Sequence, residues 1–222
     1  MSQPWHRANP ALFEKEKTEV EAAYPNLHFY VANEVVVVRG TFPIVFTGEV
    51  LDRHLIEVEL PRDHPKSLPI VRETGGRIPR TPDRHMNPVD GTACVLLLDE
   101  RWRVWPNGST LLQFLDGPVH NFFLGQSLVE LGDRWPFGQW SHGAEGIREF
   151  YTDVLGTVDI RVITGYLDCL GKKKIKGHWS CPCRSGKRLR DCHSALVQDL
   201  AAKIPRQVAI RSFGTLREKF KP

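Results

Sequence analysis

Two side chains in the stretch between His85 and Trp102 have types and spacing that suit covalent chemistry. Cys94 is the single cysteine of this stretch, and Asn87 lies seven residues before it. A thiolate is a strong nucleophile, and a nearby asparagine amide can donate a hydrogen bond to a developing oxyanion. Free cysteine is also among the most buried residue types, so the same position fits a small core residue. The residues alone leave both interpretations of Cys94 open.

A second chemical pattern lies near the C-terminus, where Cys181, Cys183, Cys192 and His193 form a C-x-C-x8-C-H array. Four such ligands within thirteen residues supply a closed tetrahedral zinc site. Because all four positions are taken by protein, we expect the zinc to be structural and the surrounding segment to fold only with metal. Cys169 lies outside the array in an apolar helical setting and is expected in the core.

The composition is that of an ordinary globular protein, with 222 residues, 41% hydrophobic and 25% charged. The longest apolar runs, 35–38 and 95–98, are far too short to cross a bilayer, and the N-terminus has no apolar segment typical of a signal peptide. Five cysteines, three of them crowded beside a histidine, favour metal binding in a reducing compartment over disulfides. We therefore expect a cytoplasmic protein with no membrane partner.

Charge is distributed unevenly along the chain. Residues 172–222 hold fourteen Lys/Arg and three Asp/Glu, a balance of +11, whereas the remainder has a balance of −7. This asymmetry predicts two domains, 1–170 and 171–222, joined by an exposed basic link at 171–177. We expect the basic domain to dock on an acidic protein surface. A nucleic-acid patch is less favoured because few aromatic residues interleave the charges, and a merely solvated face remains the third interpretation.

Hydrophobic periodicity and turn residues predict an α+β fold. Asn9 and Pro10 suit the start of a helix, Ser109 could cap a second one, and Pro118 would kink it. The expected elements are a helix at 10–23, a meander of three or four antiparallel strands from 27–39, 41–50 and 54–60, a proline-rich loop at 61–87, an apolar strand directly after Cys94, a long helix at 109–131, and helices at 145–155 and 158–170.

The order of these features resembles the ubiquitin-conjugating-enzyme (UBC) family. The residues that carry the resemblance are the proline-rich stretch 60–69, the tripeptide His85-Met86-Asn87 in place of a His-Pro-Asn turn, the small-residue approach 91–95 to Cys94, and Trp102 eight residues beyond that cysteine. The resemblance covers about residues 10–131. It implies a UBC-like fold: an N-terminal helix, a four-stranded antiparallel meander and C-terminal helices.

The resemblance also implies roles for the site residues. Cys94 would carry an acyl group as a thioester and deliver it to an amine, and His85 would be structural rather than a base. Asn87 would either donate to the oxyanion or hold the loop in shape. Asp99, Asp116 and Asp133 are candidates for an acidic residue that orients the incoming lysine, and each also fits a solvated surface charge.

The segment 125–151 is similar to bacterial UBC-like proteins of cyclic-oligonucleotide-based antiphage signalling (CBASS) operons. This similarity implies that the partner is a cGAS/DncV-like nucleotidyltransferase, whose C-terminus would be the acyl donor, and that the reaction primes antiviral defence. His142, in a Ser-His-Gly turn of this segment, could reach the cysteine or could equally cap a helix.

The run 181–193 resembles the SEC-C motif, a small zinc module found at protein termini. The predicted C-terminal domain is therefore a basic SEC-C-type zinc module followed by a C-terminal helix. Two other functions remain open: a catalytically silent UBC-like binding module with a zinc docking piece, and a nucleic-acid-binding zinc protein that depends on the basic tail alone.

Overall fold

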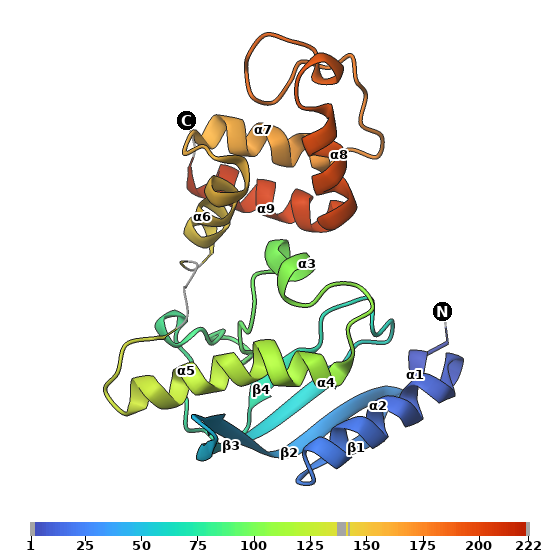
Figure 1. Ribbon diagram of the computed structural model, residues 1–222, viewed down its shortest axis with the longest axis vertical. Helices are drawn as coiled ribbons and strands as arrows, with labels where there is room; N and C mark the ends of the chain where they lie inside the picture. Colours follow the sequence, from blue (N-terminus) through green and yellow to red (C-terminus); the bar gives the residue numbers. More distant parts are fainter. Residues whose placement is uncertain (1–2, 137–140, 142, 221–222) are drawn as a thin grey trace. The chain divides into compact units, whose positions relative to one another are not determined.

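Four antiparallel strands form one sheet in the order β1-β2-β3-β4 (Figure 1). The strands are β1 (Leu27–Ala32), β2 (Val35–Phe46), β3 (Glu49–Leu60) and β4 (Ile70–Glu73) in a computed structural model that describes residues 3–136, 141 and 143–220. Alternate residues of the strands are buried, including Val36, Val38 and Phe42 of β2 and Ile56 and Val58 of β3. One face of the sheet therefore packs on the core, as its alternating sequence requires. The predicted meander is confirmed.

The strand boundaries differ from those expected. The predicted strand 27–39 is divided by a turn at Asn33 and Glu34, whose φ angles are +50° and +64°. Gly40 separates the predicted strands 27–39 and 41–50, but it lies inside β2 with φ +151°. A Cβ at this position would lie 1.8 Å from the carbonyl oxygen of Asn26. Glycine is therefore needed here because the backbone of Asn26 lies so close, and not because the chain reverses direction.

Helix α2 (Pro10–Ala23) begins as predicted, because the Asn9 side chain accepts a hydrogen bond from the Leu12 amide at 3.2 Å. It follows the short α1 (Trp5–Ala8) and buries Glu16 and Val20. The Glu16 carboxylate lies 2.9 Å from the buried ring of His64 and also accepts from the Leu111 amide at 3.2 Å. This one carboxylate joins α2, the proline-rich loop and the start of the next helix.

The predicted helix at 109–131 is present, with a local change at Pro118. It consists of α4 (Leu111–Phe114), a π-helical turn η3 (Leu115–Val119) and α5 (His120–Glu130), and α5 packs against β2 and β3. Pro118 has no amide hydrogen and cannot donate the regular helical bond, so the helix widens there. The cap is Thr110 and not Ser109, since Thr110 and Gln113 form a reciprocal capping box.

Four more helices follow: α6 (Ala144–Leu155), α7 (Ile160–Leu170), α8 (Ser194–Lys203) and α9 (Arg206–Lys219). The first two confirm the predicted helices, and α7 packs along α9. Their core includes Phe150, Leu167, Val197 and, as expected, Cys169. Within the described part of the chain, no helix has the length and apolar character needed to cross a membrane.

The predicted strand after Cys94 is wrong. Residues 94–97 are irregular, and a 3-10 turn η2 (Leu98–Glu100) and the one-turn helix α3 (Arg101–Val104) follow. The apolar run does not pair with the sheet because its side chains enter two different cores: Val95 and Leu96 pack with the sheet residues, whereas Leu97 packs with the helices α6 to α9.

The chain accordingly divides into two compact units. The sheet unit consists of Met1–Leu96 and Val104–Gly138, and the helical unit consists of Leu97–Arg103 and Gln139–Pro222. These bounds differ from the expected domains 1–170 and 171–222, because α6 and α7 share a core with α8 and α9 and because a segment from mid-chain joins them.

Candidate functional site

Cys94 lies at the end of a backbone-bonded turn in the sheet unit. Its amide donates to the carbonyl oxygen of His85 at 2.8 Å, and Met86 pairs with Ala93 in an antiparallel bridge. The Ala93 amide in turn donates to Val71 in β4 at 2.8 Å. The thiol side chain is exposed, so Cys94 is not a core residue. An accessible cysteine on a turn fixed by the sheet is suited to react with a large substrate.

Asn87 shapes this turn with its side-chain oxygen. Its Oδ1 accepts from the Val89 amide at 3.0 Å, while its own amide donates to Thr92 at 2.8 Å. The Asx turn uses only the carbonyl half of the side chain, leaving the Nδ2 group as the half able to donate to a substrate oxygen. The structure thus gives Asn87 a loop-shaping contact, and a donor role stays a prediction.

His85 contributes mainly its backbone. It adopts a left-handed conformation with φ +50°, and its carbonyl receives the Cys94 amide. Its ring lies 5.0 Å from that of Trp135. The preceding residue, Arg84, is held by Gln126 of α5: the Gln126 amide donates to the Arg84 carbonyl at 2.7 Å, and Arg84 Nε donates back to Gln126 Oε1 at 2.7 Å. Sequence reasoning missed Gln126, which reads there as one more polar position on an amphipathic helix.

The predicted acidic candidates have different environments. Asp99 is buried in the helical unit, where burial raises the pKa of its carboxyl, so the expectation of a solvated charge is wrong for this residue. Asp116 is exposed and accepts from the Tyr24 hydroxyl at 2.6 Å, and Asp133 is exposed. Trp102 packs in the core of the helical unit, and Lys203 Nζ lies 4.6 Å from its ring centroid. His142 lies outside the described residues.

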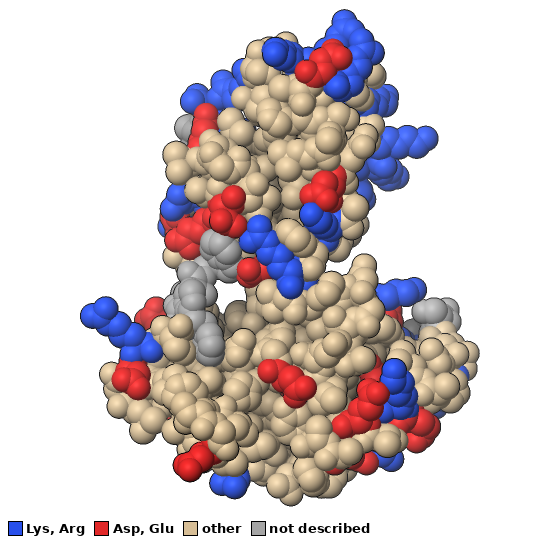
Figure 2. Space-filling model, viewed as in Figure 1, with Lys and Arg blue, Asp and Glu red and all other residues tan. Residues whose placement is uncertain are grey.

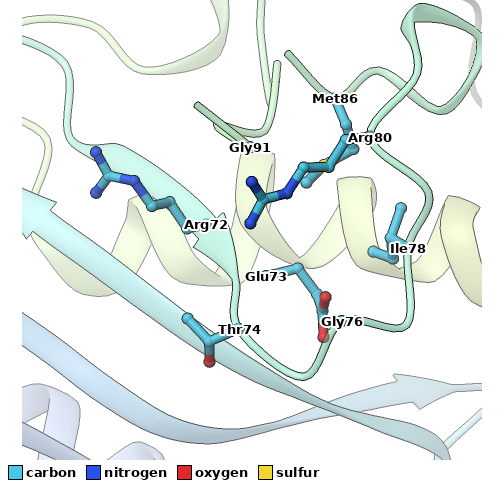
Figure 3. Close-up of a pocket in the computed structure, with 8 residues that line it drawn as sticks. All are labelled: Arg72, Glu73, Thr74, Gly76, Ile78, Arg80, Met86 and Gly91. Carbon is cyan, nitrogen blue, oxygen red and sulfur yellow. The ribbon is translucent and has the colours of Figure 1, made fainter. Parts of the chain in front are cut away.

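A pocket of about 270 Å³ opens beside the Cys94 turn (Figure 3). Met86, Ile78 and Gly91 line it together with Arg80, whose guanidinium is so close to Gly91 that a Cβ there would meet its Nε at 2.7 Å. Glu73 turns its carboxylate toward the following loop, accepting from the Gly75 amide at 2.7 Å. Cys94 does not line this pocket.

A serine, a histidine and an aspartate also meet inside the sheet unit, without forming a nucleophilic triad. Ser127 Oγ lies 2.9 Å from His54 Nε2 and donates to Asp52 at 2.6 Å. Asp52 approaches the same Nε2 atom, at 3.3 Å, and so does not orient the ring from its other nitrogen. Ser127 and His54 are both buried, which excludes attack on a substrate.

The four predicted metal ligands converge. The ligand atoms of Cys181, Cys183, Cys192 and His193 all lie within 4.8 Å of one another. Cys181 Sγ and Cys192 Sγ are 3.3 and 3.1 Å from His193 Nδ1, and the sulfurs of Cys183 and Cys192 are 3.6 Å apart. In a tetrahedron with Zn–S of about 2.3 Å and Zn–N of about 2.0 Å, ligand atoms are roughly 3.5 to 3.8 Å apart. The residues therefore fit one metal ion.

Local backbone structure brings these ligands together. A bridge between Ser180 and Arg188 and the bond from the Cys181 amide to Lys187 close a short loop, in which Arg184 takes φ +64°. His193 directly precedes α8. Although partial burial acts in the opposite direction, hydrogen bonds from Ser185 lower the pKa of the Cys183 thiol to about 6, which favours the thiolate that binds metal.

The loop that carries the cysteines is strongly basic. Residues 172–190 contain eight lysines and arginines, all exposed, and no acidic residue. Figure 2 shows such side chains projecting from the helical unit, over the part that holds the loop between α7 and α8. A surface of this kind attracts polyanionic or acidic partners.

No protein-family model matches the chain, and searches of curated proteins and of solved structures give no significant match. The functional conclusion therefore depends on the geometry of the two sites.

Proposed function

We propose that the protein is a UBC-like acyl transferase in which Cys94 carries a protein C-terminus as a thioester and delivers it to an amine. The observation that carries the proposal is the exposed thiol of Cys94, on a turn whose backbone is bonded to His85 and β4. Support comes from the order of elements, with a helix, a four-stranded meander, the cysteine turn and a long helix in succession.

The chemistry requires two displacement steps at one carbonyl carbon. The Cys94 thiolate attacks an activated acyl donor, an acyl adenylate or a thioester, forming the C–S bond as the donor's leaving group departs. An amine then attacks the same carbon, the C–N bond forms, the C–S bond breaks, and the amine loses its proton to solvent. Asn87 Nδ2 would donate to the oxyanion, a contribution of about 3 kcal/mol in comparable sites.

For the partner we propose a cGAS/DncV-like nucleotidyltransferase whose C-terminus is the acyl group, with the reaction priming antiphage signalling. The resemblance of the sequence to CBASS proteins supports this setting. The exposed basic residues of the helical unit would dock on an acidic surface of the partner.

For the metal we propose zinc in a structural role, held by Cys181, Cys183, Cys192 and His193. Three thiolates and one imidazole are a donor set that zinc prefers, and with four protein ligands no position remains for a substrate. When bound, the ion would cross-link the loop to the start of α8.

The transferase proposal is tested by comparing Cys94→Ala and Cys94→Ser in the presence of the nucleotidyltransferase and an activating system. Wild type should form an adduct that a thiol reductant cleaves, Cys94→Ser a more stable oxygen ester, and Cys94→Ala none. Cys169→Ala is the matched control, since this cysteine is buried. A reducible adduct in the Cys94→Ala protein would refute the proposal.

One observation favours a second function, a silent UBC-like binding module. The Asn87 side chain is engaged in shaping its own turn, so its presence is explained without any catalytic role. In that case Cys94→Ala would leave both partner binding and cellular activity at the wild-type level.

A further inference from the structure

Helix α5 holds the stretch of chain that leads into the Cys94 turn. Gln126, fully buried in α5, donates from Nε2 to the Arg84 carbonyl at 2.7 Å and accepts at Oε1 from Arg84 Nε at 2.7 Å. Both halves of one side-chain amide are thus occupied by a single residue that lies 42 positions earlier in the chain. A buried amide that makes such a pair of bonds fixes the backbone to which it is bonded.

His85, the next residue, requires this support. Its φ is +50°, in the left-handed region that residues other than glycine seldom adopt and keep only where the surrounding structure fixes them. Its carbonyl oxygen accepts from the Cys94 amide at 2.8 Å. Only the two backbone torsions of His85 therefore lie between the peptide group that Gln126 holds and the peptide group that holds Cys94.

The same helix also supports the His85 side chain. The His85 ring lies 5.0 Å from the ring of Trp135, which packs against Phe122 of α5 at a centroid distance of 6.1 Å. Gly125 makes room for the Trp135 ring, because a Cβ there would lie 2.7 Å from its Cη2 atom. Two consecutive residues of α5, Gly125 and Gln126, thus act on the side chain and on the backbone of one short stretch.

We propose that Gln126 is a positioning residue, which holds the Cys94 turn in the conformation that acyl transfer requires. Gln126, Arg84, His85 and Cys94 all belong to the sheet unit, so the whole path of contacts lies within one compact body. The inference depends on the proposed function in taking Cys94 as the thiol that carries the acyl group. Because Gln126 is fully buried, it acts on the reaction only through this turn.

Gln126→Met tests the proposal, because it removes the donor and the acceptor while keeping a side chain of similar size. Amide exchange of the full-length protein, followed residue by residue by NMR, should be about tenfold or more faster at Cys94 and unchanged in β2 and β3. The single-turnover transfer rate at saturating acyl donor should fall about tenfold or more, since small misplacements of reacting groups are costly in rate. The donor concentration that gives half of the maximal rate should stay at the wild-type value, a split that general loss of stability would not produce.

Two further variants separate this role from a general effect on the helix. Ser127→Ala removes the neighbouring buried hydroxyl of α5, which donates to Asp52 and to the Phe123 carbonyl, and should leave Cys94 exchange and transfer at wild-type rates. Arg84→Met removes the guanidinium but keeps the carbonyl that Gln126 holds, so it should affect both readouts less than Gln126→Met. Equal effects of Ser127→Ala and Gln126→Met would overturn the proposal.

The two readouts distinguish failure of this inference from failure of the proposed function. Faster Cys94 exchange in Gln126→Met, together with transfer that survives Cys94→Ala, would refute the transferase and leave the hold of Gln126 on the turn intact. Wild-type exchange or a wild-type transfer rate in Gln126→Met, with transfer still dependent on Cys94, would overturn the positioning role alone.

Discussion

At the scale of single residues, Asn87 offers a way to separate turn formation from catalysis. Asn87→Asp keeps an oxygen that accepts from the Val89 amide but removes the Nδ2 donor, whereas Asn87→Ala removes both. We expect Asn87→Asp to keep wild-type stability and to lower the transfer rate about 100-fold, in line with the loss of one oxyanion donor.

The measurements are single-turnover transfer and thermal unfolding of the same two variants. Asn87→Ala should show the rate loss together with a lower unfolding temperature, and the loss of stability should be about 0.5–2 kcal/mol, as for a side-chain cap at the start of a helix. Full activity of Asn87→Asp would assign the residue to the turn alone and remove it from the proposed chemistry.

The buried His54 should make the stability of the protein depend on pH. Burial lowers its pKa, outweighing the opposite effect of Asp52, whereas in the unfolded chain it titrates near 6.5. As pH falls below 6.5 the unfolded state gains a proton that the folded state does not, so the stability that His54 contributes is lost, by up to about 1.4 kcal/mol per pH unit. Denaturant unfolding of His54→Gln between pH 7 and about 5 should show a shallower decline. His28→Gln is the control, because it removes an imidazole at an exposed position. Equal declines of the unfolding free energy with falling pH in His54→Gln and wild type would contradict the prediction.

At the scale of elements, Gly40 and Gly48 form a matched pair. Gly40→Ala places a Cβ 1.8 Å from the Asn26 oxygen in the middle of the sheet, whereas a Cβ at Gly48, also at positive φ, meets nothing within 4 Å. We expect Gly40→Ala to destabilise the protein by about 2 to 5 kcal/mol, from overpacking and backbone strain together, and Gly48→Ala by about 1 kcal/mol. Equilibrium unfolding in urea measures both, and equal losses would show that the sheet relaxes around the clash.

The same comparison shows what the sequence could predict about elements. Helix α2 was predictable because its Asn-Pro start is a local signal, and the helices α6 and α7 have strong periodicity over their own lengths. Gly40 does not end a strand as predicted, because the sequence cannot distinguish a glycine that makes room for a neighbouring carbonyl oxygen from a glycine that permits a turn. The apolar run after Cys94 reads as a strand for a similar reason: local pattern does not tell which of two cores each side chain enters.

The two candidate sites also differ in how far the sequence alone predicts them. The metal ligands lie within thirteen residues, so their convergence is a local property that spacing predicts. The support of the Cys94 turn includes Gln126 of α5, which holds Arg84 and is distant from it in sequence. Only the folded chain brings Gln126 to this turn.

At the scale of the whole molecule, the two units should respond differently to loss of metal. A structural zinc site contributes about 10–16 kcal/mol of apparent folding energy in small zinc modules, as much as or more than the 5–15 kcal/mol that stabilises a typical domain. The sheet unit has a separate core, with Val38, Phe42 and Phe123 among its fully buried members. Metal removal should therefore unfold the helical unit and leave the sheet intact.

Cys183→Ser tests this without a chelator, with Cys94→Ser as the matched control at an exposed cysteine outside the cluster. We expect Cys183→Ser to lose one equivalent of zinc by elemental analysis, to lose helical signal in circular dichroism, and to exchange amides of α7 to α9 rapidly while β2 and β3 stay protected. Because α6 and α7 share the core of α8 and α9, the loss of amide protection should extend well before the first ligand, Cys181. If amide protection is lost only after residue 171, the zinc module is independent of α6 and α7. If the amides of β2 and β3 also lose protection, the two units fold as one.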